Sequence, residues 1–223
     1  MEIANLFRWS GAKKCKHLVY IGGSCSFIAQ TAFEPAASEE YGAAAGWTTV
    51  DVRADGALAV EVGMFNKSTT RIPEALFMQF QPADGGGLWY ADKLGEWVAS
   101  DDIVPGGSQH LQGVMERGLR YNASDGRHVM EIGSTDAGLA NFGELTAYPS
   151  PVNTSADTKT HGSSFVLFDN LWGTNYVEWW PFQVPPPAQY AASSKYFPSS
   201  WNNDMVSRYT IELRDSYICR GPC

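Results

Sequence analysis

The 223-residue sequence lacks the features that mark several large classes of protein. Its four cysteines, Cys15, Cys25, Cys219 and Cys223, lie only near the ends, so the long middle of the chain needs no disulfide framework. No run approaches the roughly 18–20 apolar residues of a membrane-spanning helix. There are 16 Lys and Arg against 24 Asp and Glu, and this excess of acid argues against a nucleic-acid partner. These absences predict an acidic globular protein with neither a membrane nor a nucleic-acid partner.

Helical periodicity is also missing, and short alternating patterns take its place. Hydrophobic residues make up 44% of the chain, which is enough for a substantial core. Leu58, Val60, Val62 and Met64 alternate with small or polar residues after an Asp-Gly turn at 55–56, as in a β-hairpin. Further strands are expected at 48–52, 76–80, 88–93, 108–115, 118–121, 128–132, 144–148, 165–171, 176–180 and 207–213. The pattern predicts an all-β fold, a β-sandwich or supersandwich of about ten or more short antiparallel strands.

The pattern divides the chain into three parts. Residues 1–46 show no strand or helix periodicity, residues 47–214 carry the sandwich pattern, and residues 215–223 form a cysteine-bearing tail. The cysteines are spaced C-x9-C and C-x3-C without a nearby histidine pair, which is poor spacing for a zinc site. We therefore expect no metal ligands in this chain.

One aromatic segment, residues 165–182, holds three of the eight tryptophans. Surface loops rarely carry so many rings, because exposed rings leave apolar area in water. The segment is therefore either a core strand followed by an aromatic corner or the frame of a ligand site. Asp169 and Glu178 lie within it, on either side of Trp172. Sugars commonly stack on tryptophan while Asp, Glu and Asn take their hydroxyl groups.

Catalytic motifs are scarce. His110 lies in a glycine-bracketed strand and is a candidate proton carrier if its face lines a cleft; otherwise that face simply meets water. Asp101 and Asp102 are read as a turn, because neighbours on a strand point to opposite faces and cannot act as a catalytic pair. No nucleophile elbow, phosphate-binding loop, zinc-protease motif or dinucleotide fingerprint is present in the sequence.

Three glycosylation sequons occur in turn-like contexts, at Asn66, Asn122 and Asn153. They favour secretion, although chance produces such triplets in a chain rich in Asn and Ser. A basic stretch before residues 17–33 loosely imitates a signal peptide, but polar residues interrupt its apolar run. The sequence leaves both a secreted and a cytoplasmic location open.

Several ordered blocks resemble a known group of proteins. They are VGMFNKSTTRIPEALF at 62–77, DKLGEW at 92–97, GGSQHL at 106–111 and LFDNLWGTNY at 167–176. Together these blocks are similar to the C-terminal region of the fungal glycoside hydrolase family 38-like proteins, which are related to α-mannosidases and contain a domain of unknown function. The resemblance covers residues 47–214.

The resemblance implies a β-rich supersandwich that packs against a catalytic barrel holding zinc and an aspartate nucleophile. No such barrel is encoded in this chain, so zinc and activity are expected only in a missing catalytic domain. The chain is read as a truncated gene product or a detached domain, and its unfamiliar ends favour truncation. A sandwich that normally packs on a barrel should expose an apolar face, so self-association is expected when the barrel is absent.

The expected function is therefore that of a non-catalytic β-domain that supports or edges a carbohydrate site. A free-standing carbohydrate-binding module is the second hypothesis, and a sugar-epimerase-like enzyme that uses His110 is the third. Candidate sugar-binding residues, chosen from the two blocks densest in polar and aromatic side chains, are His110, Asp169, Asn170, Trp172 and Asn175.

Overall fold

The computed structural model describes residues 12–15, 26–33, 45–67, 74–102, 111–145, 157–170 and 203–215. These residues form strands β1 (Ala12–Cys15), β2 (Ser26–Phe33), β3 (Ala45–Val52), β4 (Leu58–Lys67), β5 (Glu74–Phe80), β6 (Leu88–Lys93), β7 (Glu96–Ala99), β8 (Leu111–Gly113), β9 (Leu119–Asn122), β10 (His128–Ser134), β11 (Leu139–Phe142), β12 (Ser163–Asn170) and β13 (Asn203–Asp215), with one short helix, α2 (Thr158–His161). The expected all-β class is confirmed.

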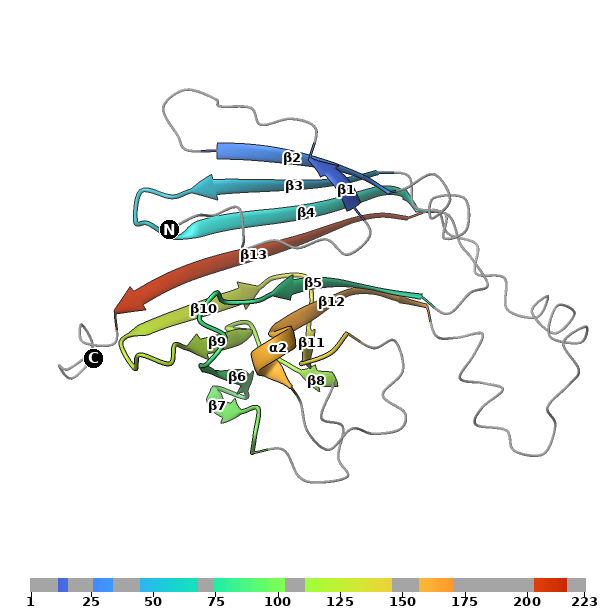
Figure 1. The fold of residues 1–223 in the computed structure, drawn as a ribbon. Helices are drawn as coiled ribbons and strands as arrows, with labels where there is room; N and C mark the ends of the chain where they lie inside the picture. The colour runs from blue at the N-terminus through green and yellow to red at the C-terminus, as the bar shows by residue number, and fades with distance from the viewer. Residues whose placement is uncertain are drawn as a thin grey trace, which may run out of the picture.

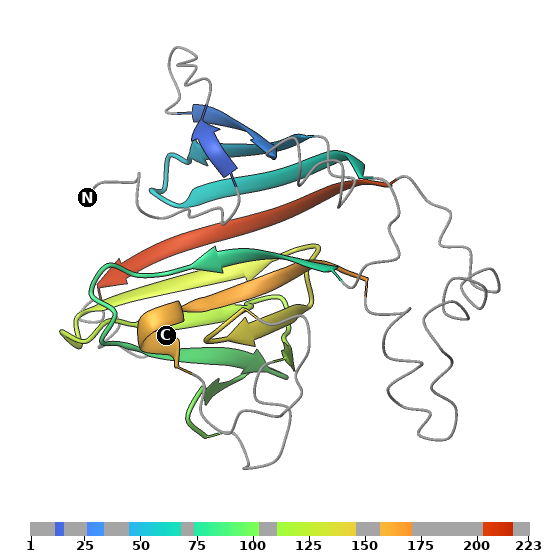
Figure 2. The ribbon, with the colours of Figure 1, turned by 45° about the vertical axis from the view of Figure 1, so that its right-hand side comes forward.

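The strands of the described residues form two antiparallel sheets, which pack as a β-sandwich (Figure 1). The large sheet has nine strands in the order β1-β2-β3-β4-β13-β10-β9-β6-β7, and the small sheet has four in the order β5-β12-β11-β8. Strand β13 occupies the middle of the large sheet, between β4 and β10, as Figure 2 shows in red. Strand β13, from the C-terminal part of the chain, thus joins the β1–β4 strands to the β6, β7, β9 and β10 strands in one sheet.

The β3–β4 hairpin shows why these residues form strands. Its turn has Gly56 at φ +85°, a backbone conformation that glycine adopts without strain. Asp55 Oδ1 accepts a hydrogen bond of 3.0 Å from the backbone N–H of Ala57, which fixes the turn. Beyond it, Val60 and Val62 are buried, whereas Glu61 between them is exposed. The predicted hairpin is confirmed.

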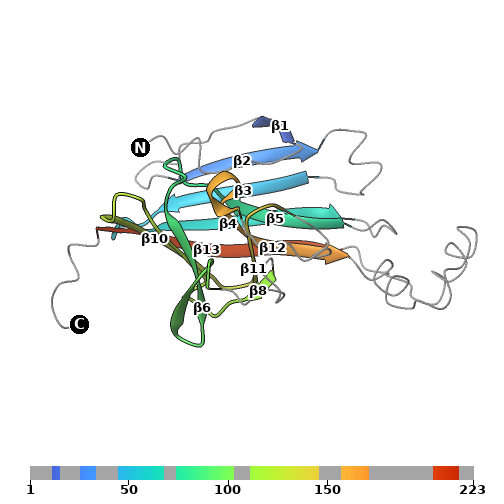
Figure 3. The same ribbon diagram turned by 60° about the horizontal axis from the view of Figure 1, so that its bottom comes forward.

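The core lies between the two sheets, and aromatic rings connect them. Phe80 on β5 and Phe165 on β12 both contact Tyr209 on β13, with ring centroids 6.0 and 5.2 Å apart. Figure 3 shows β12 lying over β13 in this region. Tilted and edge-on contacts of this kind add to the free energy gained by burying the rings.

Four strands were not predicted from the sequence. Strands β1 and β2 lie within the segment that showed no pattern, and β2 pairs with β3, so the large sheet crosses the expected boundary at residue 46. Strands β7 and β11 have only four residues each, too few for alternation to stand out. The strand expected at 144–148 does not begin at 144–145, and 146–148 lie outside the described residues. The strand expected at 176–180 lies outside them entirely.

Candidate functional site

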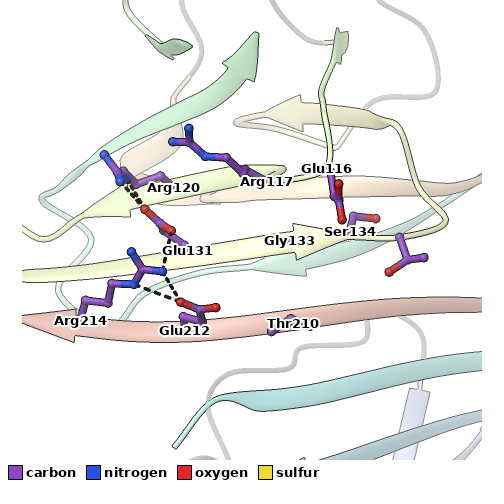
Figure 4. A pocket seen from close by; sticks show the side chains of 10 residues that line it. Glu116, Arg117, Arg120, Glu131, Gly133, Ser134, Thr210, Glu212 and Arg214 are labelled. Atoms are coloured by element: carbon purple, nitrogen blue, oxygen red, sulfur yellow. Dashed lines mark hydrogen bonds and ion pairs between the residues drawn. The ribbon is translucent and has the colours of Figure 1, made fainter. Parts of the chain in front are cut away.

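A polar groove of about 460 Å³ lies on the outer face of the large sheet, where β9, β10 and β13 run side by side (Figure 4). The lining side chains are mostly charged or carry a hydroxyl group, and three acids balance three arginines. The lining residues are Glu116, Arg117, Arg120, Glu131, Gly133, Ser134, Thr135, Thr210, Glu212 and Arg214. We call this surface the outer-face groove.

Strand alternation places the charged side chains in the groove. On β9, Leu119 is buried in the core and Arg120 points the other way. On β10, Ile132 is buried and Glu131 faces outward. On β13, Ile211 is buried and Glu212 faces outward. Because successive strand residues face opposite sides of a sheet, the same hydrophobic pattern that builds the core builds the groove.

The register then puts opposite charges beside one another. Arg120 pairs with Glu131 across β9 and β10, and Glu131 pairs with Glu212 across β10 and β13. Two facing carboxylates repel, and Arg214 offsets this repulsion by contacting both. Arg214 donates from Nε to Glu212 Oε2 at 3.0 Å, and its guanidinium lies 3.5 Å from Glu131 Oε2. The result is an ordered row of charges.

Glu131 is the centre of this row. Arg120 donates to its Oε1 from Nε at 2.9 Å and from a terminal nitrogen of the same guanidinium. The Glu131 side chain is only 14% exposed, so water screens these contacts less than it screens an ordinary surface pair. Hydrogen bonds between two charged groups are among the stronger ones in proteins, and they hold the groove lining in one geometry.

An aromatic ring lies beside one end of the groove. The guanidinium carbons of Arg117 and Arg120 lie 4.2 and 4.5 Å from the centroid of Trp97 on β7. Cations are attracted to the face of an indole ring, so Trp97 orients both arginines. Arg117 also donates to the backbone oxygen of Gly95 at 3.2 Å. The arginines are therefore held from two sides.

Two glycines shape the groove. Gly133 lies within β10 and lines the groove without a side chain, a position at which a strand admits close approach by a ligand or another backbone. Gly118 precedes β9 at φ +65°, and a Cβ there would lie 2.3 Å from the backbone oxygen of Ile132. Gly118 thus permits the tight turn that places Arg117 and Arg120 on either side of it.

The sugar-binding residues expected from the sequence are not among these groove residues. His110, Trp172 and Asn175 lie outside the described residues. Asp169 and Asn170 end β12, where they pair with Ala75 and Glu74, but their side chains are not among those described. Their expected roles stay predictions. Sequence reasoning missed the groove, whose only signal was an Arg or Glu at the outward positions of three separate strands.

Other expectations fall on described residues. Asp102 donates its backbone N–H to the oxygen of Ala99 at 3.1 Å, so Asp101 and Asp102 form the predicted turn.

The three glycosylation sequons differ in what the structure describes. Asn122 lies on β9 and is partly buried, and its Oδ1 is buried without a partner in the described part of the chain. Asn66 lies on β4 with its side chain outside the description, and Asn153 lies outside it entirely.

A second polar cluster lies on the opposite side of the sandwich, on the outer face of the small sheet. Asn141 and Ser164 pair across β11 and β12, and Gln79 follows on β5. Gln79 donates from Nε2 to the backbone oxygen of His161 at 2.6 Å. Asn141 Oδ1 and Ser164 Oγ are buried without a hydrogen-bond partner among the described residues. Because both atoms are buried, whereas the outer-face groove is open, this cluster is the weaker candidate.

Neither a metal site nor a membrane span is found within the described ranges. No group of three or more His, Cys, Asp or Glu side chains there could hold a metal ion. None of the helices there is long and apolar enough to cross a membrane.

Comparison with protein-family models, curated proteins and solved structures finds no match to this chain. The resemblance to the fungal α-mannosidase-like proteins therefore stays a prediction.

Proposed function

We propose that this chain is a non-catalytic carbohydrate-binding β-sandwich and that its sugar site is the outer-face groove. The observation that supports this most is the balanced row of Arg120, Glu131, Arg214 and Glu212 in an open groove beside Trp97. A sugar hydroxyl both donates and accepts hydrogen bonds, so it pairs well with neighbouring guanidinium and carboxylate groups.

The charge balance favours a neutral ligand. Three carboxylates and three guanidiniums line the groove, so its formal charge is zero. A phosphate or a nucleic acid calls for an excess of Lys and Arg, and a metal cation calls for an excess of carboxylates. The hydroxyls of Thr135 and Thr210 add further partners that carry no charge. A neutral molecule rich in hydroxyl groups matches this lining best.

The same geometry argues against hydrolysis in the groove. A glycoside hydrolase needs one carboxyl group that keeps its proton and a second that acts as base or nucleophile. In this groove Glu131 and Glu212 are both engaged in ion pairs with guanidinium groups. Binding without catalysis is also the role that the resemblance implied for a β-domain lacking its barrel.

The test is isothermal titration calorimetry of the whole chain against neutral gluco- and manno-oligosaccharides. We expect saturable binding. The double substitution Glu131→Gln and Glu212→Gln should weaken it at least tenfold, because each substitution replaces a charged hydrogen-bond acceptor by a neutral amide. The matched control is Glu144→Gln, the same change at an exposed site that follows β11 of the small sheet, away from the groove lining. It should leave the affinity unchanged.

Two results would contradict the proposal. One is an absence of saturable binding to any neutral sugar. The other is a double variant that remains folded by circular dichroism and binds as tightly as the unmodified chain. Gly133→Val provides a second check, because it fills the groove without removing any charge. This variant should also lose affinity if the ligand enters the groove.

A further inference from the structure

A second feature of the same outer face is a small apolar surface built around Gly63. Trp47 on β3 and Val206 on β13 both pair with Gly63 on β4, one on each side. Trp47 is 37% exposed and Val206 is 42% exposed. The ring of Phe65 lies over the glycine, since a Cβ at Gly63 would be 3.2 Å from Phe65 Cε2. We call Trp47, Phe65 and Val206 the aromatic platform.

The aromatic platform and the outer-face groove lie on one continuous surface. Along β13, the residues that face outward are Val206, Arg208, Thr210, Glu212 and Arg214, so one strand runs from the platform into the groove. The four steps along the strand from Val206 to Thr210 span about 13 Å. The residues beside Thr210 on the two neighbouring strands are Ala59 and Gly133. Because these residues have little or no side chain, the surface is low and open at this position.

Arg208 lies between the platform and the groove, and its orientation is fixed. Its Nε and a terminal nitrogen donate to Asp136 at 2.9 and 2.7 Å, and its backbone N–H donates to the same carboxylate. The hydrogen bonds from Arg208 lower the pKa of Asp136, so that carboxylate stays charged at neutral pH. A held guanidinium is a suitable donor for a ligand lying along the strand, because little side-chain freedom is lost on binding.

We propose that a linear, neutral, glucose-type glycan lies along this face, stacking one sugar on Trp47 while other sugars occupy the outer-face groove. This inference rests on the proposed function and names the class of sugar chain. A pyranose with equatorial hydroxyl groups presents a flat C–H face, which packs on an indole ring. A span of about 13 Å along β13 exceeds a single sugar ring, so the ligand is a chain.

The size and charge of the surface favour a glycan over a macromolecular partner. Stable protein interfaces bury at least about 1,200 Å² in total and have an apolar centre. The platform has three apolar side chains, and charged or polar side chains adjoin it on β13. A sugar chain needs only the alternation of apolar and hydrogen-bonding positions that this face offers.

The experiment compares cellobiose with cellohexaose as calorimetric ligands for the whole chain. We expect cellohexaose to bind more tightly, and Trp47→Ala to weaken cellohexaose by about tenfold while leaving cellobiose unchanged. The matched control is Leu139→Ala, which truncates another half-exposed apolar side chain on the small sheet. It should change neither affinity.

The outcomes separate this inference from the function on which it rests. If Trp47→Ala keeps full cellohexaose affinity while Glu131→Gln with Glu212→Gln loses it, the platform is no part of the site and the groove proposal stands. Equal affinity for cellobiose and cellohexaose also overturns the extended site. If a manno-oligosaccharide binds and cellohexaose does not, the proposed sugar class is wrong. If no neutral sugar binds at all, the carbohydrate function itself fails.

Discussion

Tyr121 on β9 donates a hydrogen bond from its phenol to the carboxylate of Asp84, which lies 37 residues earlier in the chain, in the loop between β5 and β6. The same phenol oxygen accepts the backbone N–H of Gly87 at 2.8 Å. The other Asp84 oxygen accepts from the backbone and the hydroxyl of Ser124 at 3.0 and 3.1 Å. Tyr121 therefore ties the β5–β6 loop to the end of β9, one of the strands that line the groove.

Removing this phenol should destabilise the fold. Tyr121→Phe keeps the ring that packs on Trp89 but leaves an Asp84 oxygen and the Gly87 N–H unpaired. We expect the free energy of unfolding to fall by about 1–3 kcal/mol, measured by urea denaturation. Tyr90→Phe, on the other face of the adjacent strand, is the control and should cost less. Equal losses for both variants would mean that the Asp84 contact does not stabilise the fold.

The stability should also fall in alkali through Tyr121. Burial, together with the hydrogen bond to Asp84, raises the pKa of Tyr121 from 10.0 to about 12. A raised pKa in the folded state means that the contribution is complete below pH 10 and is lost as the pH rises through about 12. Urea midpoints measured across this window should decline more for the unmodified chain than for Tyr121→Phe. Parallel declines would contradict the assignment.

Two glycines of similar backbone conformation should respond very differently to alanine. Gly118 and Gly126 have φ of +65° and +66°, but a Cβ at Gly118 would lie 2.3 Å from Ile132 O, whereas a Cβ at Gly126 meets nothing within 4 Å. We expect a loss of about 1–2 kcal/mol for Gly126→Ala from the left-handed conformation alone. Gly118→Ala should lose about 2–5 kcal/mol, because the clash adds to it. Equal melting temperatures of the two variants would refute this difference.

Two neighbouring serines offer another matched pair. Ser163 and Ser164 are both fully buried, but Ser163 Oγ donates to Asn141 O at 2.9 Å, whereas Ser164 Oγ has no partner within the described residues. Ser163→Ala should cost about 1 kcal/mol, and Ser164→Ala should be neutral or stabilising, because it removes an unpaired buried hydroxyl. Thermal unfolding of both variants provides the measurement. A destabilised Ser164→Ala would point to a bound water or ligand at the second polar cluster.

Much of the sandwich could be predicted because inward positions alternate over several residues. Val60 and Val62 on β4, or Tyr209 and Ile211 on β13, reveal their strands through this period of two. Strand β7 was not predicted, because the turn before it is not visible in the sequence. In that turn Leu94 takes φ +57°, a backbone conformation that Asn, Asp or Gly usually adopts. In β11, Asn141 is polar yet fully buried, so the strand does not show the alternation of apolar and polar residues in its sequence.

The groove could not be predicted, because it depends on which strands become neighbours. Glu131 and Glu212 are 81 residues apart in the sequence, and only the pairing of β10 with β13 brings them together. No local pattern specifies that pairing. The sequence instead favours a ligand site in the aromatic segment at 165–182, because a dense run of rings is visible in the sequence, whereas charges brought together from three strands are not. The expected roles of Trp172 and Asn175 remain untested predictions.

The central position of β13 has a consequence for synthesis on the ribosome. Until residues 203–215 have emerged, β4 and β10 each present an open edge, and the nine-stranded sheet exists as two separate parts. Open edges can pair with other chains, so the nascent protein carries an aggregation hazard for most of its translation. A stop codon before Asn203 would leave that hazard permanent, and holdase chaperones are the cellular factors on which such a product would depend.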